Sequence, residues 1–228
     1  MLYMLVGLAQ LGLDKKFEKA VKIIQMSKAD IVVFPELFNT GYDLESIKSS
    51  NPKPIFEASK KSKALIIAGM PENNYNVAFV IHRGKIIGKH RKTKLFPLLE
   101  EEKIFKAGRI VKPIKTPFGL IGLMICYELR FPEIARKLVM KGAKILFVIA
   151  RFPLERIDHW RTLIRARAIE NQVFVVGVNS EGHSTVVDPL GKISVEFGVG
   201  ERYDEVEIDT RYVDDVRVRY PFLNYCSK

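Results

Sequence analysis

The sequence predicts an α/β protein built on mixed β-sheets, and three observations carry this prediction. Short, almost wholly apolar runs bounded by glycine, proline or charged residues recur along the 228 residues, as expected of strands buried on both faces. Segments with apolar residues at helical spacing lie between several of these runs. At residues 75–90 two strand patterns follow each other across Arg83-Gly84, which predicts a hairpin and therefore a sheet that is not wholly parallel.

The first half of the chain is expected to begin with a strand followed by a helix. Asp14 precedes apolar positions at helical spacing, so we expect it to cap a helix that ends near Lys28. The expected strands of this half are residues 2–9, 30–35, 64–70, 75–82 and 85–90, and the expected helices are residues 14–28 and 55–61.

The second half is expected to contain a strand that ends directly at Cys126. Pro132 suits the first turn of the following helix, and Glu133 suits the positive end of its dipole. The residues Asp188-Pro189-Leu190-Gly191 predict a turn. The expected strands are residues 119–125, 144–150, 174–178, 184–187, 192–197 and 203–208. One helix is expected to start at residue 132, and a second to span residues 155–170. Residues 211–220 are expected to form a terminal helix or tail.

Composition favours one globular domain spanning residues 1–228, with 47% hydrophobic and 28% charged residues. The net charge of +11 is spread along the chain without a recognisable nucleic-acid module, so we expect a solvated basic surface and no nucleic-acid partner. No apolar run is long enough for a membrane span, and the start lacks the features of a signal peptide. The two cysteines, Cys126 and Cys226, predict a reducing, cytoplasmic location. Phosphate-cradling glycine motifs and metal-ligand spacing are missing, so no cofactor and no metal are expected.

Cys126 is the first candidate for chemistry, because it stands where a strand stops and a helix starts. Oriented N–H groups at that place favour thiolate over thiol and suit an oxyanion formed by attack on a carbonyl. The alternative is a cysteine that serves only as a small apolar side chain. Glu36 also follows a buried strand, and ligands bind beyond the carboxyl ends of such strands, so both residues could share one crevice. The alternative for Glu36 is a capping or solvated carboxylate.

Three motifs resemble those of the nitrilase superfamily, the carbon-nitrogen hydrolases, and the resemblance covers essentially the whole chain. FPELFNTGY resembles the glutamate motif at Glu36. HRKTKLF resembles the lysine motif at Lys92, with Lys94 where histidine is common. CYELRFPE resembles the nucleophile motif at Cys126, with Glu128 where aspartate is more frequent. The resemblance implies a four-layer α-β-β-α sandwich and association into dimers or larger homo-oligomers through helix faces.

The resemblance also implies a mechanism without a cofactor. Glu36 is the general base, and Cys126 attacks a small-molecule amide to form a thioester. The Lys92 ammonium and the backbone N–H of Tyr127 hold the oxyanion. A second active-site glutamate falls within residues 100–102, and counting back from later residues selects Glu101, which would position Lys92 or the substrate amide. The alternative for these three glutamates is an exposed acidic turn.

Residues 155–179 and 182–192 look most like the ω-amidase branch, which deaminates monoamides of small dicarboxylic acids. That branch commonly has Ala-Asn-Trp-Pro where this chain has Ala150, Arg151, Phe152 and Pro153. Arg151 and Phe152 are therefore candidate substrate-binding residues, with Arg151 as a carboxylate anchor. The alternative is a surface arginine that pairs with the acidic segment 100–102. Nitrile hydrolysis, N-carbamoyl amide hydrolysis and a catalytically silent interaction module remain alternative functions.

Overall fold

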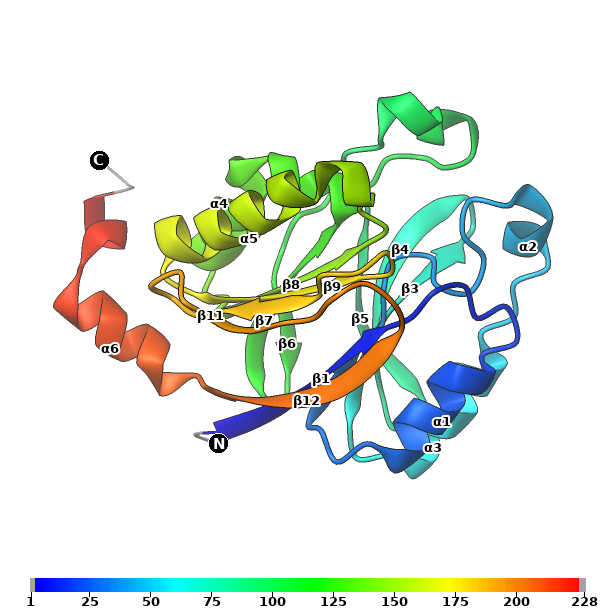
Figure 1. Ribbon diagram of the computed structural model, residues 1–228, viewed down its shortest axis with the longest axis horizontal. Coiled ribbons are helices and arrows are strands. Elements are labelled where there is room, and N and C mark those ends of the chain that lie inside the picture. Colours follow the sequence, from blue (N-terminus) through cyan, green and yellow to red (C-terminus); the bar gives the residue numbers. More distant parts are fainter. Residues whose placement is uncertain (1–2, 226–228) are drawn as a thin grey trace.

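The computed structural model describes residues 3–225 and shows two six-stranded sheets packed face to face. Helices α1 (Glu18–Met26) and α3 (Lys53–Lys61) cover the outer face of the first sheet, and α4 (Pro132–Met140) and α5 (Ile157–Asn171) cover the outer face of the second (Figure 1). The largest apolar cluster fills the space between the sheets, where it includes Val33 and Ile67 of the first sheet and Ile125 and Ile149 of the second, and it continues across the second sheet to α4 and α5. This arrangement confirms the α-β-β-α sandwich and the mixed sheets.

Both sheets have a parallel centre and antiparallel flanks. In the first sheet, in the order β12-β1-β2-β3-β4-β5, β1 and β3 each pair in parallel with β2. In the second, in the order β11-β10-β9-β8-β7-β6, β7 and β9 each pair in parallel with β8. The first sheet comprises β1 (Tyr3–Gln10), β2 (Ile31–Val33), β3 (Leu65–Glu72), β4 (Tyr75–His82), β5 (Lys85–Arg91) and β12 (Arg202–Asp209). The second comprises β6 (Ile114–Thr116), β7 (Gly119–Ile125), β8 (Ile145–Ala150), β9 (Phe174–Asn179), β10 (Thr185–Val187) and β11 (Ile193–Glu196).

The first helix starts later than its sequence pattern predicts. The chain enters it through Phe17, which has a left-handed backbone at φ 61°, so Asp14 is not the cap residue. The Asp14 carboxylate still accepts a hydrogen bond from the Ala20 N–H at 2.9 Å, because the intervening turn folds it back onto the helix start. The helices are α1 (Glu18–Met26), α2 (Leu44–Lys48), α3 (Lys53–Lys61), α4 (Pro132–Met140), α5 (Ile157–Asn171) and α6 (Arg211–Arg219).

Most other predicted elements are present, including the hairpin of β4 and β5. Helix α2 and strand β6 were not predicted. The helix spans only five residues and the strand only three, so neither shows a clear periodicity in the sequence. The terminal segment forms helix α6, so the tail alternative is wrong. Leu2 and Cys226 lie outside the described residues. Between residues 3 and 225, no helix is long and apolar enough to cross a membrane.

The carboxyl ends of four strands lie close together between the sheets. β2 leads into Glu36, β5 into Lys92, β7 into Cys126 and β8 into Arg151. The backbone at Glu36 lies directly on β3: a Cβ added at Gly69 would stand 2.5 Å from the Pro35 carbonyl oxygen and 2.6 Å from the Glu36 Cα. Glycine at this position therefore lets the chain that carries Glu36 pass close to the sheet.

Candidate active site

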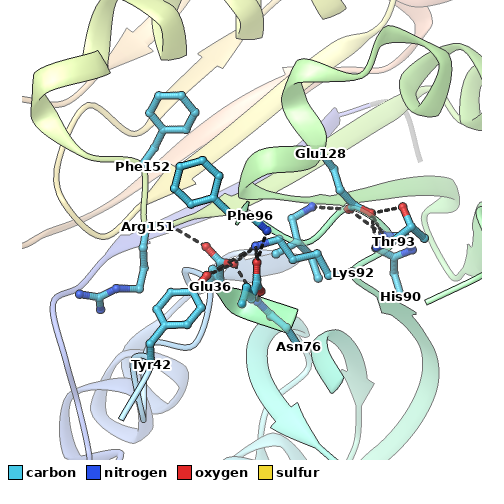
Figure 2. Close-up of polar contacts among 12 residues, drawn as sticks. Glu36, Tyr42, Asn76, His90, Lys92, Thr93, Phe96, Glu128, Arg151 and Phe152 are labelled. Atoms are coloured by element: carbon cyan, nitrogen blue, oxygen red, sulfur yellow. Dashed lines mark hydrogen bonds and ion pairs between the residues drawn. The ribbon is translucent and has the colours of Figure 1, made fainter. Parts of the chain in front are cut away.

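Lys92 lies between two carboxylates in the interior of the protein. Its Nζ is 2.8 Å from Glu36 Oε1 and 2.8 Å from Glu101 Oε2, and all three side chains are 0% exposed. The backbone of Lys92 is fixed on both sides, because its N–H donates to the Asn76 carbonyl at 2.9 Å and its own carbonyl accepts from Gly108 at 2.7 Å. Figure 2 shows the Lys92 ammonium pointing into this acidic cluster. The exposed-turn alternative therefore fails for Glu101.

Neutral donors complete the coordination of the two carboxylates. Asn76, on β4, donates one hydrogen bond to Glu36 at 2.8 Å and one to Glu101 at 3.0 Å. The Tyr42 hydroxyl donates to Glu36 Oε1 at 3.0 Å, and the Arg151 backbone N–H donates to Glu36 Oε2 at 3.1 Å. Glu36 is therefore held by groups from four separate segments, and the capping or solvated alternative for it is wrong.

Burial and neighbouring charges shift the pKa values of all three charged side chains in this cluster. Burial raises the pKa of Glu36, but the Lys92 charge and the hydrogen bonds from Lys92, Asn76 and Tyr42 outweigh it and leave that pKa below its usual value. Burial alone would lower the pKa of Lys92, yet the neighbouring carboxylates raise it well above normal. Burial and the Glu36 charge raise the pKa of Glu101. Glu36 is thus a carboxylate and Lys92 an ammonium ion at neutral pH.

Cys126 begins a short 3-10 turn, Cys126–Arg130, with a left-handed backbone at φ 45°. Its half-buried side chain packs against the core on one side and lines a pocket on the other. Burial and the Glu36 carboxylate raise the pKa of the thiol, against the opposing effects of Lys92 and the Arg151 backbone N–H. The expectation that turn N–H groups would favour a thiolate is therefore wrong: the turn is short, and a carboxylate faces the thiol. The resting cysteine is protonated.

The pocket in front of Cys126 has a volume of about 160 Å³. The predicted residues Arg151 and Phe152 both line it, and so does Tyr127, which directly follows the cysteine. The Arg151 guanidinium lies 3.3 Å from Glu181, so the predicted alternative of a partner in the acidic segment 100–102 is wrong. The further residues that line it are Tyr42, Phe96, Leu99, Arg130, Pro153 and Arg156.

Among the residues of the site that sequence reasoning missed, four are polar. Tyr42 and Arg130 stand inside the quoted glutamate and nucleophile motifs, so the motifs themselves carried the signal. Asn76 is a single buried amide in an otherwise apolar strand, a pattern that suggests a polar partner nearby. Arg156 gave no distinctive signal, because arginines recur throughout the helix that follows it. Within residues 3–225, no group of three or more histidine, cysteine, aspartate or glutamate side chains is arranged to hold a metal ion.

Comparisons with known proteins show one matching family model and several similar chains. The family model described as carbon-nitrogen hydrolase matches residues 6–218. A 2-oxoglutaramate amidase from Bacillus subtilis is 36% identical over 222 residues, covering 88% of this chain and 86% of the relative. The omega-amidase NIT3 from Saccharomyces cerevisiae is 31% identical over 245 residues, covering 90% and 82%. The crystal structure of yeast Nit3, a member of branch 10 of the nitrilase superfamily, has a TM-score of 0.87 at 28% identity and covers 100% of this chain and 97% of that chain.

Proposed function

This chain belongs to the carbon-nitrogen hydrolase family, and we propose that it hydrolyses a small carboxamide to a carboxylate and ammonia through a thioester on Cys126. One observation carries the proposal: a buried ammonium, Lys92, lies between Glu36 and Glu101, and Glu36 also faces the thiol at the pocket. This arrangement supplies a base, a nucleophile and a fixed positive charge within one water-poor site.

The first half of the reaction forms the thioester. Glu36 accepts the Cys126 proton as the sulfur attacks the amide carbon, because an ionised carboxylate beside a protonated thiol is the state that the pKa values describe. Lys92 stays an ammonium ion and stabilises the oxyanion together with the Tyr127 N–H. Glu36 then gives its proton to the leaving nitrogen, the carbon-nitrogen bond breaks, and ammonia departs.

The second half of the reaction releases the acid. Glu36 removes a proton from water as the water oxygen attacks the thioester carbon, and the returning proton restores the thiol when the carbon-sulfur bond breaks. Glu101 is the positioning residue of this scheme, because both of its carboxylate oxygens accept hydrogen bonds from the Lys92 ammonium, at 3.1 and 2.8 Å. Its two contacts with the ammonium fix the charge where the oxyanion develops.

For the substrate we propose an ω-amide of a dicarboxylic acid. Arg130, Arg151 and Arg156 all line the pocket, and their positive charges favour a ligand with a carboxylate. Arg151 Nη1 is buried and lacks a hydrogen-bond partner within residues 3–225, so it offers a donor to such a group. The names of the relatives, 2-oxoglutaramate amidase and omega-amidase, support the same class.

Ammonia release tests the proposal, with wild type and Cys126→Ala assayed against 2-oxoglutaramate, glutamine, small aliphatic amides, N-carbamoyl amino acids and nitriles. We expect ammonia from the dicarboxylic monoamides and none from the variant. Release from nitriles or N-carbamoyl compounds alone would keep the nucleophile but reject the substrate class. If no compound of the panel released ammonia and iodoacetamide did not alkylate Cys126, the catalytically silent interaction module would be favoured.

Arg151→Ala tests the carboxylate anchor, and Arg202→Ala is the matched control because Arg202 forms an exposed ion pair with Asp204. Loss of a charged hydrogen bond predicts a KM for the dicarboxylic monoamide raised about tenfold or more. The KM for a neutral aliphatic amide should barely change. An equal effect on both substrates, or the same effect in the control, would remove Arg151 from substrate recognition.

We further propose a cytoplasmic homodimer or larger homo-oligomer. Apolar side chains on the outer helices support the association, with Val218 on α6 84% exposed and Met140 and Ile169 on α4 and α5 also exposed. Light scattering on wild type and Val218→Glu tests it. A monomeric wild type would refute the proposal.

A further inference from the structure

A further buried carboxylate, Glu128, lies beside the active site but does not line its pocket. Its side chain is 0% exposed. It accepts a hydrogen bond from the Ile125 N–H at 2.8 Å, and from the N–H and hydroxyl of Thr93 at 2.7 and 2.6 Å. His90 Nε2 lies 2.8 Å from the same carboxylate (Figure 2). Ile125 immediately precedes Cys126, and Thr93 immediately follows Lys92.

The two segments that meet at Glu128 belong to different sheets. Lys92 follows β5, which is the edge strand of the first sheet, whereas Cys126 follows β7 in the second sheet. Two sheets that pack face to face are held together by interdigitating side chains and not by strand-to-strand hydrogen bonds. The Glu128 carboxylate therefore connects the residue after the ammonium with the residue before the thiol by direct hydrogen bonds.

The contacts of Glu128 require an anion. The Ile125 N–H, the Thr93 N–H and the Thr93 hydroxyl all donate to it, and a carboxylate accepts at both oxygens. Burial raises the pKa of Glu128, but His90 and the Thr93 donors outweigh burial and hold the pKa below its usual value. An amide in this place would turn an NH₂ group toward one of these donors and leave it unsatisfied.

We propose that Glu128 is a positioning residue that sets the separation between the Lys92 ammonium and the Cys126 thiol, a role that rests on the proposed amide hydrolysis. The side chain acts through the backbone on both sides and touches no substrate. Its length matters as much as its charge, since Glu128→Asp keeps the anion but draws the two segments together by one methylene. Nucleophilic catalysis is sensitive to such changes, because a misplacement of about 1 Å can cost about 100-fold in rate.

The test compares Glu128→Gln and Glu128→Asp with Glu205→Gln, a matched control far from the pocket. Glu205 also joins two segments, accepting from the Ser27 hydroxyl and the Lys28 N–H at 2.9 Å each. We expect both Glu128 variants to lose about 10- to 100-fold in kcat for ammonia release, with KM changed much less. Glu205→Gln should lower the melting temperature and leave kcat unchanged.

Alkylation of Cys126 by iodoacetamide supplies a measurement that needs no substrate. If Lys92 moves away from the thiol, the thiol ionises less readily, so its alkylation at pH 8 should slow. A purely structural role would loosen the site, expose the thiol and speed alkylation. Faster or unchanged alkylation in the Glu128 variants would overturn the proposal, whereas slow alkylation without any amide turnover by wild type would reject only the hydrolase activity.

Thr93→Val keeps the test decisive if the Glu128 variants do not fold. Valine removes the shortest hydrogen bond to Glu128 and leaves the backbone N–H donors in place. Because one charge-assisted hydrogen bond is lost, we expect kcat to fall about tenfold. Alkylation of Cys126 should be slower than in wild type, as in the Glu128 variants. Wild-type values for both would overturn the proposal.

Discussion

Replacement of Lys92 by methionine should destabilise the protein strongly, because it leaves two buried carboxylates without their shared cation. Glu36 and Glu101 each lie 2.8 Å from Lys92 Nζ and are joined by the Asn76 amide. Breaking a buried ion pair by removing one partner costs about 3–5 kcal/mol. For a chain of 228 residues, each kcal/mol lowers the melting temperature by about 2–4 °C, so we expect a fall of about 6–20 °C at pH 7.

The loss of stability in Lys92→Met should depend on pH, and the direction of this dependence follows from the pKa of Glu36. Its lowered pKa contributes stability above the ordinary value of 4.5, and that contribution is lost as pH falls through the lower folded value. Without Lys92, burial dominates and raises the folded pKa above 4.5, so the carboxyl destabilises the fold as pH rises beyond 4.5. The gap in melting temperature should therefore be largest at neutral pH and shrink toward pH 4.

Differential scanning calorimetry from pH 4 to 8 measures both effects. Lys89→Met is the control, because Lys89 forms a partly exposed pair with Glu72 that should contribute about 0–1 kcal/mol. The double variant Lys92→Met, Glu101→Gln should recover part of the lost stability and none of the activity. A Lys92→Met loss no larger than the control, or a gap that widens at acidic pH, would refute the electrostatic reasoning.

Three further predictions concern the same site. Glu36→Gln should abolish ammonia release yet speed alkylation of Cys126 at pH 8, because the Glu36 charge raises the pKa of the thiol; slower alkylation would contradict this. Gly69→Ala should lower kcat about 100-fold, since its Cβ meets backbone at 2.5 Å and displaces Glu36; unchanged kinetics would show that the backbone yields freely. Tyr42→Phe should lower stability by about 1.5–3 kcal/mol through the lost hydrogen bond to Glu36, and an unchanged urea midpoint would exclude this contribution.

The strands that carry the site were predictable because each is a local apolar run. The runs before Glu36 and Cys126 need no tertiary information, and the hairpin before Lys92 has its own turn residues. Among the three consecutive glutamates, motif spacing selected Glu101, the one whose side chain is buried against Lys92, while its neighbours are exposed. Local pattern and motif order thus led to the residues that the structure brings together.

Two of the features that sequence reasoning got wrong depend on contacts between distant segments, and a third depends on an unusual local backbone conformation. The ionisation of Cys126 depends on Glu36, which lies 90 positions earlier in the chain, so the local turn was a poor guide. The partner of Arg151 is Glu181, which a separate loop brings to the pocket. The late start of α1 depends on the left-handed Phe17, a conformation that its residue type does not announce.

The pKa values of the site imply that the thiolate is formed only during the reaction. With the pKa of Glu36 lowered and that of Cys126 raised, proton transfer from thiol to carboxylate is unfavourable in the free site. Lys92 cannot remove the proton instead, because its own raised pKa keeps it charged. In the proposed reaction the negative charge therefore moves onto the substrate oxygen as the proton leaves sulfur, and the Lys92 ammonium would stabilise it there. A free enzyme of this kind keeps its cysteine in the less reactive protonated form, which limits oxidation and side reactions while the pocket is empty.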